Sequence, residues 1–180
     1  YILFPLIISI PYYFSIQNIS LVNSYFEAIS GFTSTGFTIF ENIKQLDESL
    51  ILWRSTSQWI GGIYFLFSIL LLIDIFDKNL KQSFTEYLSF NYNEIFNQSL
   101  KIIIIYSSLT LLIFILFKTI NLRTFDAFNL SLSIISSGGF LPVNRVDYLF
   151  ESDVSKIILS FTMLLSFFSL FLIYNLIFFN

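Results

Sequence analysis

The sequence predicts an all-α membrane protein in which one arrangement of helices occurs twice. Its 180 residues are 56% hydrophobic and 12% charged, whereas about a quarter of the residues in a soluble domain are charged. Four apolar stretches approach or reach the roughly 20 residues that a helix needs to cross a bilayer. Two shorter segments complete the order long helix, short helix, small-residue turn, loop, long helix, which then repeats.

The composition excludes several classes of function. The chain has no cysteine and no histidine, so it lacks disulfides, thiolate metal sites and the commonest general base. The net charge is −3, and no basic patch suggests a nucleic-acid partner. No serine lies beside a lysine in a nucleophilic arrangement, so we expect no enzyme. The chain begins at Tyr1 inside an apolar run, and we expect it to be a piece of a longer protein.

The first half of the chain contains two long apolar segments and a short one. Residues 1–16 indicate the end of a membrane helix. Residues 20–32 are too short to span and are predicted as a helix of about three turns. Residues 49–73 form the second long helix, in which Arg54 is the one charged residue. In lipid these segments should be helical, because every backbone polar group must be paired internally.

A mixed, amphipathic linker over residues 74–101 leads to the second half. The elements predicted there are a long helix, a short helix and a long helix over residues 102–118, 124–135 and 156–179. Thr124 is expected to cap the short helix, and Asp126 suits its first turn.

The two short segments match at an offset of 102 residues. Phe26 and Phe128 each lie ten residues before a glycine, Gly36 or Gly138. TSTG at 33–36 therefore pairs with ISSG at 135–138. Both matches fall at the end of a short helix between two long ones, which indicates an internal repeat.

The small residues after each short helix favour a pore loop. A helix that enters the membrane without crossing must return through non-helical backbone, which is tolerated only inside protein or beside a water-filled cavity. Glycine permits such turns, the C-terminus of a helix favours a cation, and successive carbonyls can replace the water shell of an ion. The alternative is that Gly31 and Gly36 let two helices pack closely.

Three stretches resemble the Trk/Ktr/HKT potassium-uptake family. SYFEAISGFTSTGFT (24–38) and SLILWRSTSQWIGG (49–62) are similar to the first repeat of the family, and FDAFNLSLSIISSGGF (125–140) to the second. The resemblance implies a potassium-channel-like fold with four repeats of M1, pore helix, filter loop and M2 around one pore. This chain would supply two of them, over residues 1–73 and 102–180.

The resemblance also implies which groups bind the transported potassium ion. They are backbone carbonyls of the filter loops at 33–38 and 135–140, contributed by Thr33, Ser34, Thr35, Gly36, Ile135, Ser136, Ser137 and Gly138. No cofactor is implied besides potassium.

A cell-membrane location follows from the same resemblance, in the bacterial inner membrane, as a multi-pass protein. The filter loops would enter from outside, and the 74–101 linker would be cytoplasmic. The implied partners are membrane lipid, the missing second half of the pore, a second complete pore in a homodimer and a cytosolic nucleotide-binding regulatory subunit, with no nucleic acid.

Charged and aromatic residues beside the loops are expected to be structural. Glu27 and Asp126 lie early in the short helices, where acids more often stabilise a helix start than attract cations. Arg54 is expected to anchor its span near the membrane surface by snorkelling, although an intramembrane charge is also a functional candidate. The residues expected to pack between helices or mark the interface are Trp53, Trp59, Gly61 and Gly62.

Two other functions remain open from the sequence. A transporter of another substrate would use the same glycine-broken segments as discontinuous helices. A non-conducting assembly subunit is the second alternative. The transporter does not require Gly36 and Gly138 to face a common axis, so the separation of the two loops discriminates between it and a channel. Rescue of potassium uptake by the full protein discriminates between a channel and the assembly subunit.

Overall fold

The computed structural model describes the backbone of residues 2–76 and 92–178 and the side chains of residues 2–68 and 100–167. Over these ranges the chain is helical and has no strands, which confirms the all-α prediction. The helices are α1 (Leu3–Ser15), α2 (Leu21–Phe32), α3 (Glu48–Phe76), α5 (Tyr92–Thr119), α6 (Thr124–Ile135) and α7 (Asp153–Phe178). The loops before α3 and α7 each contain a short 3-10 turn, at Ile43–Gln45 and Val146–Tyr148.

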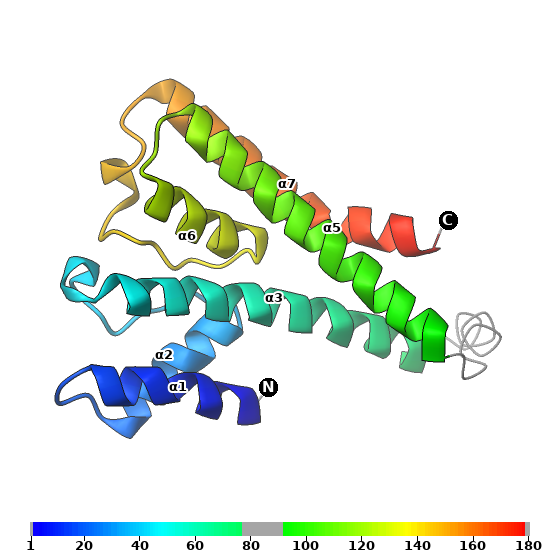
Figure 1. Cartoon of the computed structure of the whole chain (residues 1–180), viewed down its shortest axis with the longest axis horizontal. Helices are drawn as coiled ribbons and strands as arrows, with labels where there is room; N and C mark the ends of the chain where they lie inside the picture. The colour runs from blue at the N-terminus through cyan, green and yellow to red at the C-terminus, as the bar shows by residue number, and fades with distance from the viewer. Residues whose placement is uncertain (1, 77–91, 179–180) are drawn as a thin grey trace.

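The helices form two similar groups, α1 to α3 and α5 to α7 (Figure 1). The short helix α2 packs against α1 and α3, and the short helix α6 packs against α5 and α7. Helix α3 also packs against α6, so it contacts the short helices of both groups. This shared helix brings the two groups together.

Both short helices enter the molecule and do not cross it. The turns α1–α2 and α5–α6 lie at one end of the molecule, and each short helix runs inward from that end (Figure 1). The loop that follows each short helix returns to the same end before the next long helix begins. The C-terminal end of α3 and the N-terminal end of α5 lie at the opposite end.

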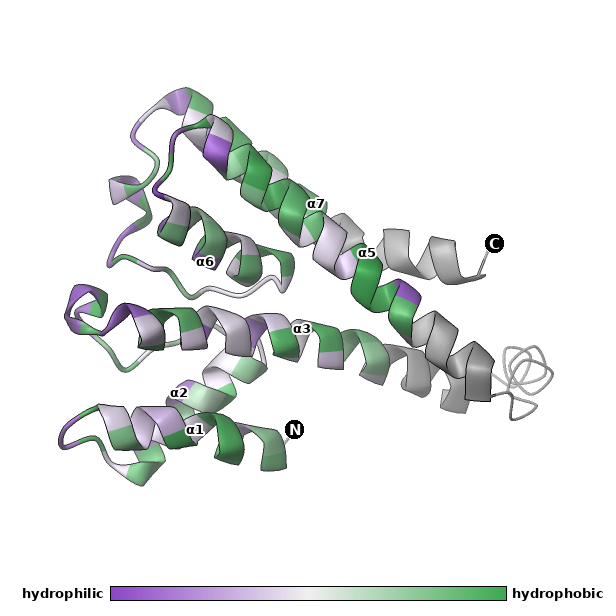
Figure 2. Cartoon of the chain, viewed as in Figure 1, coloured by the Kyte–Doolittle hydropathy of each residue, from purple (hydrophilic) through white to green (hydrophobic). Residues whose placement is uncertain are grey.

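The surface and the length of the helices suit an apolar environment. Within the described residues, one stretch, Leu100–Thr119 of α5, is long and apolar enough to cross a membrane, with a mean hydropathy of 2.5. Figure 2 shows this apolar character along α5. Large apolar side chains are also exposed on α1, among them Leu3 (74%) and Phe14 (79%). Such faces occur where a helix contacts lipid or further protein.

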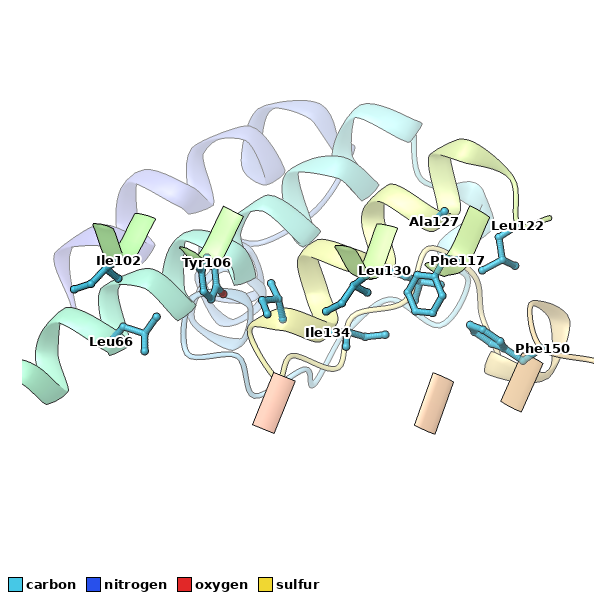
Figure 3. Close-up of a cluster of buried hydrophobic side chains, with 11 residues drawn as sticks. Leu66, Ile102, Tyr106, Phe117, Leu122, Ala127, Leu130, Ile134 and Phe150 are labelled. Atoms are coloured by element: carbon cyan, nitrogen blue, oxygen red, sulfur yellow. The ribbon is translucent and has the colours of Figure 1, made fainter. Parts of the chain in front are cut away.

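Each group of helices has its own apolar core. The first core lies between α1, α2 and the start of α3 and contains Ile8, Tyr12, Ala28, Phe32 and Leu50. The second joins α5 and α6 to one residue of α3 and one of the loop before α7 (Figure 3). Its members are Leu66, Ile102, Tyr106, Ile113, Phe117, Leu122, Ala127, Leu130, Ile134, Ile135 and Phe150. Each short helix is therefore held by buried apolar side chains as well as by its loop.

The helices extend beyond the apolar stretches that predicted them. Helix α3 continues to Phe76 and α5 begins at Tyr92, so part of the linker expected over 74–101 is helical. Helix α7 begins at Asp153 and not at residue 156. Apolar residues mark the part of a helix that avoids water, whereas Glu, Gln and Lys continue a helix past that part. Residues 77–91 of the linker lie outside the described residues.

The two short helices begin differently. The Ser20 hydroxyl caps α2 by accepting a hydrogen bond from the Asn23 amide at 3.1 Å. The expectation that Thr124 caps α6 is wrong, because Thr124 is the first helical residue and Arg123 precedes it. The Thr124 hydroxyl accepts instead from Lys118 Nζ at 3.1 Å. This contact joins the start of α6 to the end of α5.

Candidate functional site

The loops after α2 and α6 begin with the same backbone conformation. Thr33 is the C-cap of α2, with φ −86° and ψ 3°, and Ser136 is the C-cap of α6, with φ −83° and ψ 3°. The next residues, Ser34 and Ser137, have φ of 54° and 53°, in the left-handed region that serine rarely adopts. Two serines in this conformation at matched places indicate a structure that the surrounding contacts impose.

Backbone hydrogen bonds fix both helix ends as Schellman motifs. The amides of Ser34 and Thr35 donate to the carbonyls of Gly31 and Ser30, each at 3.0 Å. In the second loop the same two bonds join Ser137 to Ile134 and Gly138 to Ser133, each at 2.8 Å. This motif satisfies carbonyls that the end of a helix leaves unpaired. The direction in which the chain leaves the helix is thereby set in both repeats.

The two repeats align at an offset of 103 residues, and the offset of 102 is wrong. Helices α2 and α6 begin and end 103 residues apart, and so do the 3-10 turns at Ile43–Gln45 and Val146–Tyr148. The left-handed serines have the same spacing. Under this offset Gly36 corresponds to Gly139, and Gly138 corresponds to Thr35. The dipeptide Gly-Phe, at 36–37 and 139–140, was the signal in the sequence that carried the correct register.

One serine in each short helix ties the returning loop to that helix. The Ser30 hydroxyl donates to the Phe37 carbonyl, and the Ser133 hydroxyl shares its single hydrogen between the Phe140 carbonyl, at 2.9 Å, and Gln58 Oε1, at 2.6 Å. Each loop is therefore closed on its own helix, by the same hydrogen bond at the same offset.

The two loops meet at their equivalent glycines. Gly36 has φ 79°, which glycine tolerates and other residues resist. A Cβ added to Gly36 would lie 2.6 Å from Gly139 Cα and 2.7 Å from Gly139 N. A Cβ added to Gly139 would lie 3.3 Å from Gly36 Cα. The two turns thus approach each other closely, with backbone against backbone.

The residues expected to line the ion path divide into two kinds. Those in the two loops are exposed or half-buried, and they are Thr33, Ser34, Thr35, Gly36, Ser136, Ser137 and Gly138. Ile135 differs, because it is the last residue of α6 and is 2% exposed within the apolar core. Its counterpart in the first repeat is Phe32, which ends α2 and is 1% exposed.

A buried ion pair supports the first loop. Glu27 is the seventh residue of α2, so the expectation that it lies early in the helix and stabilises its start is wrong. Its carboxylate accepts hydrogen bonds from Arg54 Nε at 2.8 Å, from the Thr38 hydroxyl and from the Ile39 amide at 3.1 Å. The side chains of Glu27 and Arg54 are 0% and 1% exposed. The pair therefore fastens the chain just after Gly36 to both α2 and α3.

Arg54 is buried in the protein interior, where it binds neighbouring segments. The expectation that it snorkels to the membrane surface is wrong. Its Nη2 donates to the Thr38 hydroxyl at 3.0 Å. Its guanidinium lies over the rings of Phe140, at 4.1 Å from the centroid, and of Phe40, at 5.6 Å. Such cation–π contacts are worth about 2 kcal/mol when desolvated. Arg54 consequently contacts the loops of both repeats.

The second repeat has no equivalent of this pair, because Leu130 stands at the position of Glu27. The acid of its short helix, Asp126, lies in the first turn of α6 and is half-buried. Burial raises the pKa of Asp126 above its ordinary value, against the opposing effect of the nearby Arg123 charge. Asp126 is thus near a helix start, as expected, and remote in sequence from the residues of the loop.

The small and aromatic residues of α3 make the expected close contacts between helices. A Cβ added to Gly61 would overlap the carbonyl oxygen of Phe32, at the end of α2. A Cβ added to Gly31 would lie 2.5 Å from Ser57 Oγ, so this glycine serves close packing. Two indole nitrogens of α3 donate to other helices, Trp53 to the Ile8 carbonyl at 3.0 Å and Trp59 to Thr110 Oγ1 at 3.1 Å.

The fold is that of a solved potassium transporter. The structure superposes on TrkH from Vibrio parahaemolyticus with a TM-score of 0.77 at 24% sequence identity. The superposition covers 91% of this chain and 33% of TrkH. The chain is therefore an all-helical protein with the fold of a membrane transporter.

Sequence relatives point to the same family. An uncharacterised cation transporter of Methanocaldococcus jannaschii is 32% identical over 156 residues, which are 84% of this chain and 32% of the relative. The Trk system potassium uptake protein TrkI of Halomonas elongata is 44% identical over 55 residues, or 31% of this chain and 11% of TrkI. TrkG of Escherichia coli is 27% identical over 154 residues, or 78% of this chain and 30% of TrkG.

No family model matches the chain. The chain spans about a third of the length of the relatives that it matches over most of its own length. Its helices, its re-entrant loops and its relatives agree, and the chain belongs to the family of the Trk potassium-uptake proteins.

Proposed function

We propose that this chain forms part of a pathway for potassium uptake across a cell membrane. The observation that carries the proposal is the meeting of two equivalent re-entrant loops at Gly36 and Gly139. The two turns have the same conformation, and both follow the C-terminus of a short helix, where the helix dipole favours a cation. Relatives named as potassium uptake proteins support potassium as the ion.

The ion would be held by backbone carbonyls of both loops. In the first loop these are the carbonyls proposed from the sequence, of Thr33, Ser34, Thr35 and Gly36. The offset of 103 residues moves the second set by one position, to Ser136, Ser137, Gly138 and Gly139. Ile135 leaves the set because it belongs to α6 and its core. Successive carbonyl rings can replace the hydration shell of potassium while each site stays weak enough for release.

Two loops supply half of a fourfold ring. The other half belongs either to further sequence in the same protein or to a second copy of the chain. We extend the proposal to a multi-pass protein of the bacterial inner membrane whose loops face outward. The C-terminal end of α3 and the N-terminal end of α5 lie at the end opposite to the loops, which supports a cytoplasmic linker between the two helices. A homodimer of complete pores and a cytosolic nucleotide-binding subunit are the proposed partners.

The close approach of the glycines favours a channel over the two alternatives. A transporter with discontinuous helices binds its substrate near the middle of the membrane and needs no shared axis. A non-conducting assembly subunit needs no matched loop geometry. The equal conformation of Ser34 and Ser137 gives no advantage in either case.

Growth rescue tests the proposal. The full-length protein that contains this chain is expressed in a bacterium without potassium-uptake systems, on medium with low potassium. We expect growth with the wild type and with Ser108→Ala, since the Ser108 hydroxyl bonds only within α5 to the Ile105 carbonyl at 2.8 Å. We expect no growth, or growth that sodium inhibits, with Gly139→Ser. Wild-type protein that reaches the membrane and gives no rescue overturns the proposal.

A further inference from the structure

A glutamine of the first repeat reaches the loop of the second. Gln58 lies on α3, one turn after Arg54, and its residue is 0% exposed. Its Oε1 accepts a hydrogen bond from Ser133 Oγ at 2.6 Å and a second, longer one from the Phe140 amide at 3.4 Å. These two donors lie in the last turns of α6 and just after Gly139. One side-chain oxygen thus bridges the beginning and the end of the second loop.

The amide of Gln58 also lies against the backbone between those two points. A Cβ added to Gly138 would lie 2.7 Å from Gln58 Nε2 and would overlap the rest of the amide group. Gln58 therefore occupies the space that a side chain at position 138 would need. The two glycines of the second loop have different neighbours. A side chain at position 138 would overlap Gln58, and a side chain at position 139 would approach Gly36.

Burial of the Gln58 amide costs more free energy than burial of an apolar side chain of the same shape would. Among the described residues its Nε2 has no hydrogen-bond partner, although the atom is buried. An unpaired buried donor costs about 1–3 kcal/mol, and an apolar residue of the same shape would avoid that cost. A buried polar group that is only partly paired therefore calls for a specific explanation.

The first loop has no such contact with the second repeat's helices among the described residues, because the Glu27–Arg54 pair supports it from within its own repeat. The second loop has Leu130 at the place of Glu27 and lacks this internal support. Two contacts with Phe140 in this loop come instead from α3, where Arg54 lies over the Phe140 ring and Gln58 accepts from the Phe140 amide.

We propose that Gln58 is a positioning residue for ion selection. It holds the carbonyls of residues 136–139 at a fixed distance from the first loop, because Gln58 belongs to the rigid helix α3. The inference rests on the proposed function of the two loops. Gln58 does not touch the ion; it acts through the backbone between Ser133 and Phe140. A site that is held by a neighbouring rigid helix keeps its geometry better than a loop alone.

The first test measures the loop without any transport. In the full-length protein, purified in detergent, Gln58→Met removes the acceptor and keeps the length of the side chain. Amide hydrogen exchange is then compared over residues 136–142 and over residues 33–39. We expect exchange in the second loop to rise about tenfold, because one net hydrogen bond of protection is lost, and no change in the first. Unchanged exchange over 136–142 overturns the proposal.

The second test measures selection between ions. Sodium and potassium uptake are compared in vesicles that contain wild-type protein, Gln58→Met, Ser133→Ala or the control Ser131→Ala. Ser131 is buried on the same helix as Ser133, but its hydroxyl donates only to the Phe128 carbonyl of α6, at 2.7 Å. We expect the sodium-to-potassium uptake ratio to be several-fold higher than in the wild type for Gln58→Met and Ser133→Ala. We expect the ratio of the control Ser131→Ala to be unchanged.

The outcomes separate the inference from the proposed function. If exchange rises in the second loop and the ion ratio is unchanged, Gln58 holds the loop without affecting ion selection, and the proposal is overturned. If the wild type shows no preference for potassium, the proposed function fails, whereas the exchange data still decide whether Gln58 positions the loop. If Gln58→Met does not fold, Gln58→Leu also removes the acceptor, leaves the bond from Ser133 to the Phe140 carbonyl in place and gives the same two readouts.

Discussion

The buried pair of Glu27 and Arg54 predicts a large loss of stability when one partner is removed. The substitution Arg54→Met keeps most of the side-chain volume and removes the positive charge. Glu27, which is 0% exposed, then retains the Thr38 hydroxyl and the Ile39 amide as donors but loses its counter-charge. Breaking a buried pair by removing one partner costs about 3–5 kcal/mol. The loss of the Phe140 contact adds about 1–2 kcal/mol more.

A double variant tests whether the uncompensated charge causes that loss. In Arg54→Met/Glu27→Gln the buried carboxylate is gone, so we expect the double variant to be more stable than Arg54→Met by about 2 kcal/mol. Arg123→Met is the control, because its ion pair with Glu48 joins side chains that are 61% and 59% exposed. Exposed pairs contribute little, and we expect no measurable change for this control.

Equilibrium unfolding in mixed detergent micelles measures these differences in the full-length protein. Equal losses for Arg54→Met and Arg123→Met would show that burial of the pair has no energetic consequence here. A double variant that is less stable than both Arg54→Met and Glu27→Gln would refute the account based on charge, and would leave packing of the arginine as the cause.

The remaining predictions concern close contacts and the first loop. Gly61→Ala places a methyl group on the Phe32 carbonyl and should prevent stable folding. Gel filtration would then show a loss of monodisperse protein. A normal elution profile would contradict the packing of α2 on α3. Gly36→Ser should raise the sodium-to-potassium flux ratio without lowering expression, since it forces a side chain into φ 79°, and an unchanged ratio removes Gly36 from the filter. Trp59→Phe removes the hydrogen bond to Thr110 and should cost about 1 kcal/mol in unfolding free energy, with transport unaffected.

The sequence predicted the helices well because apolar length and small-residue turns are local signals. The short helices were placed within one residue of their observed bounds, Leu21–Phe32 and Thr124–Ile135. The ends of the long helices were less accurate, since polar residues such as those at 92–101 continue a helix without any apolar pattern. The conformation of the two loops, in contrast, was predicted only in outline.

Contacts between segments far apart in the sequence could not be predicted from one chain. The pairing of Glu27 with Arg54 joins residues of two helices, and the contact of Gln58 with Ser133 spans 75 residues. Neither has a local sequence signal. The alignment of the second loop with the first was wrong for a different reason. Residues 138 and 139 are both glycine, and the comparison of side-chain types paired Gly36 with Gly138, the one that lies closer to the helix.

The adjacent glycines 138 and 139 set a constraint on how this protein can change in evolution. A Cβ on Gly138 would overlap the Gln58 side chain, whereas a Cβ on Gly139 would lie 3.3 Å from the Cα of Gly36, a backbone atom that no substitution can remove. A shorter residue at position 58 therefore creates room for alanine or serine at 138, and we expect such pairs to vary together among related sequences. The neighbour of position 139 is backbone and not a side chain, so we expect position 139 to vary independently of position 58.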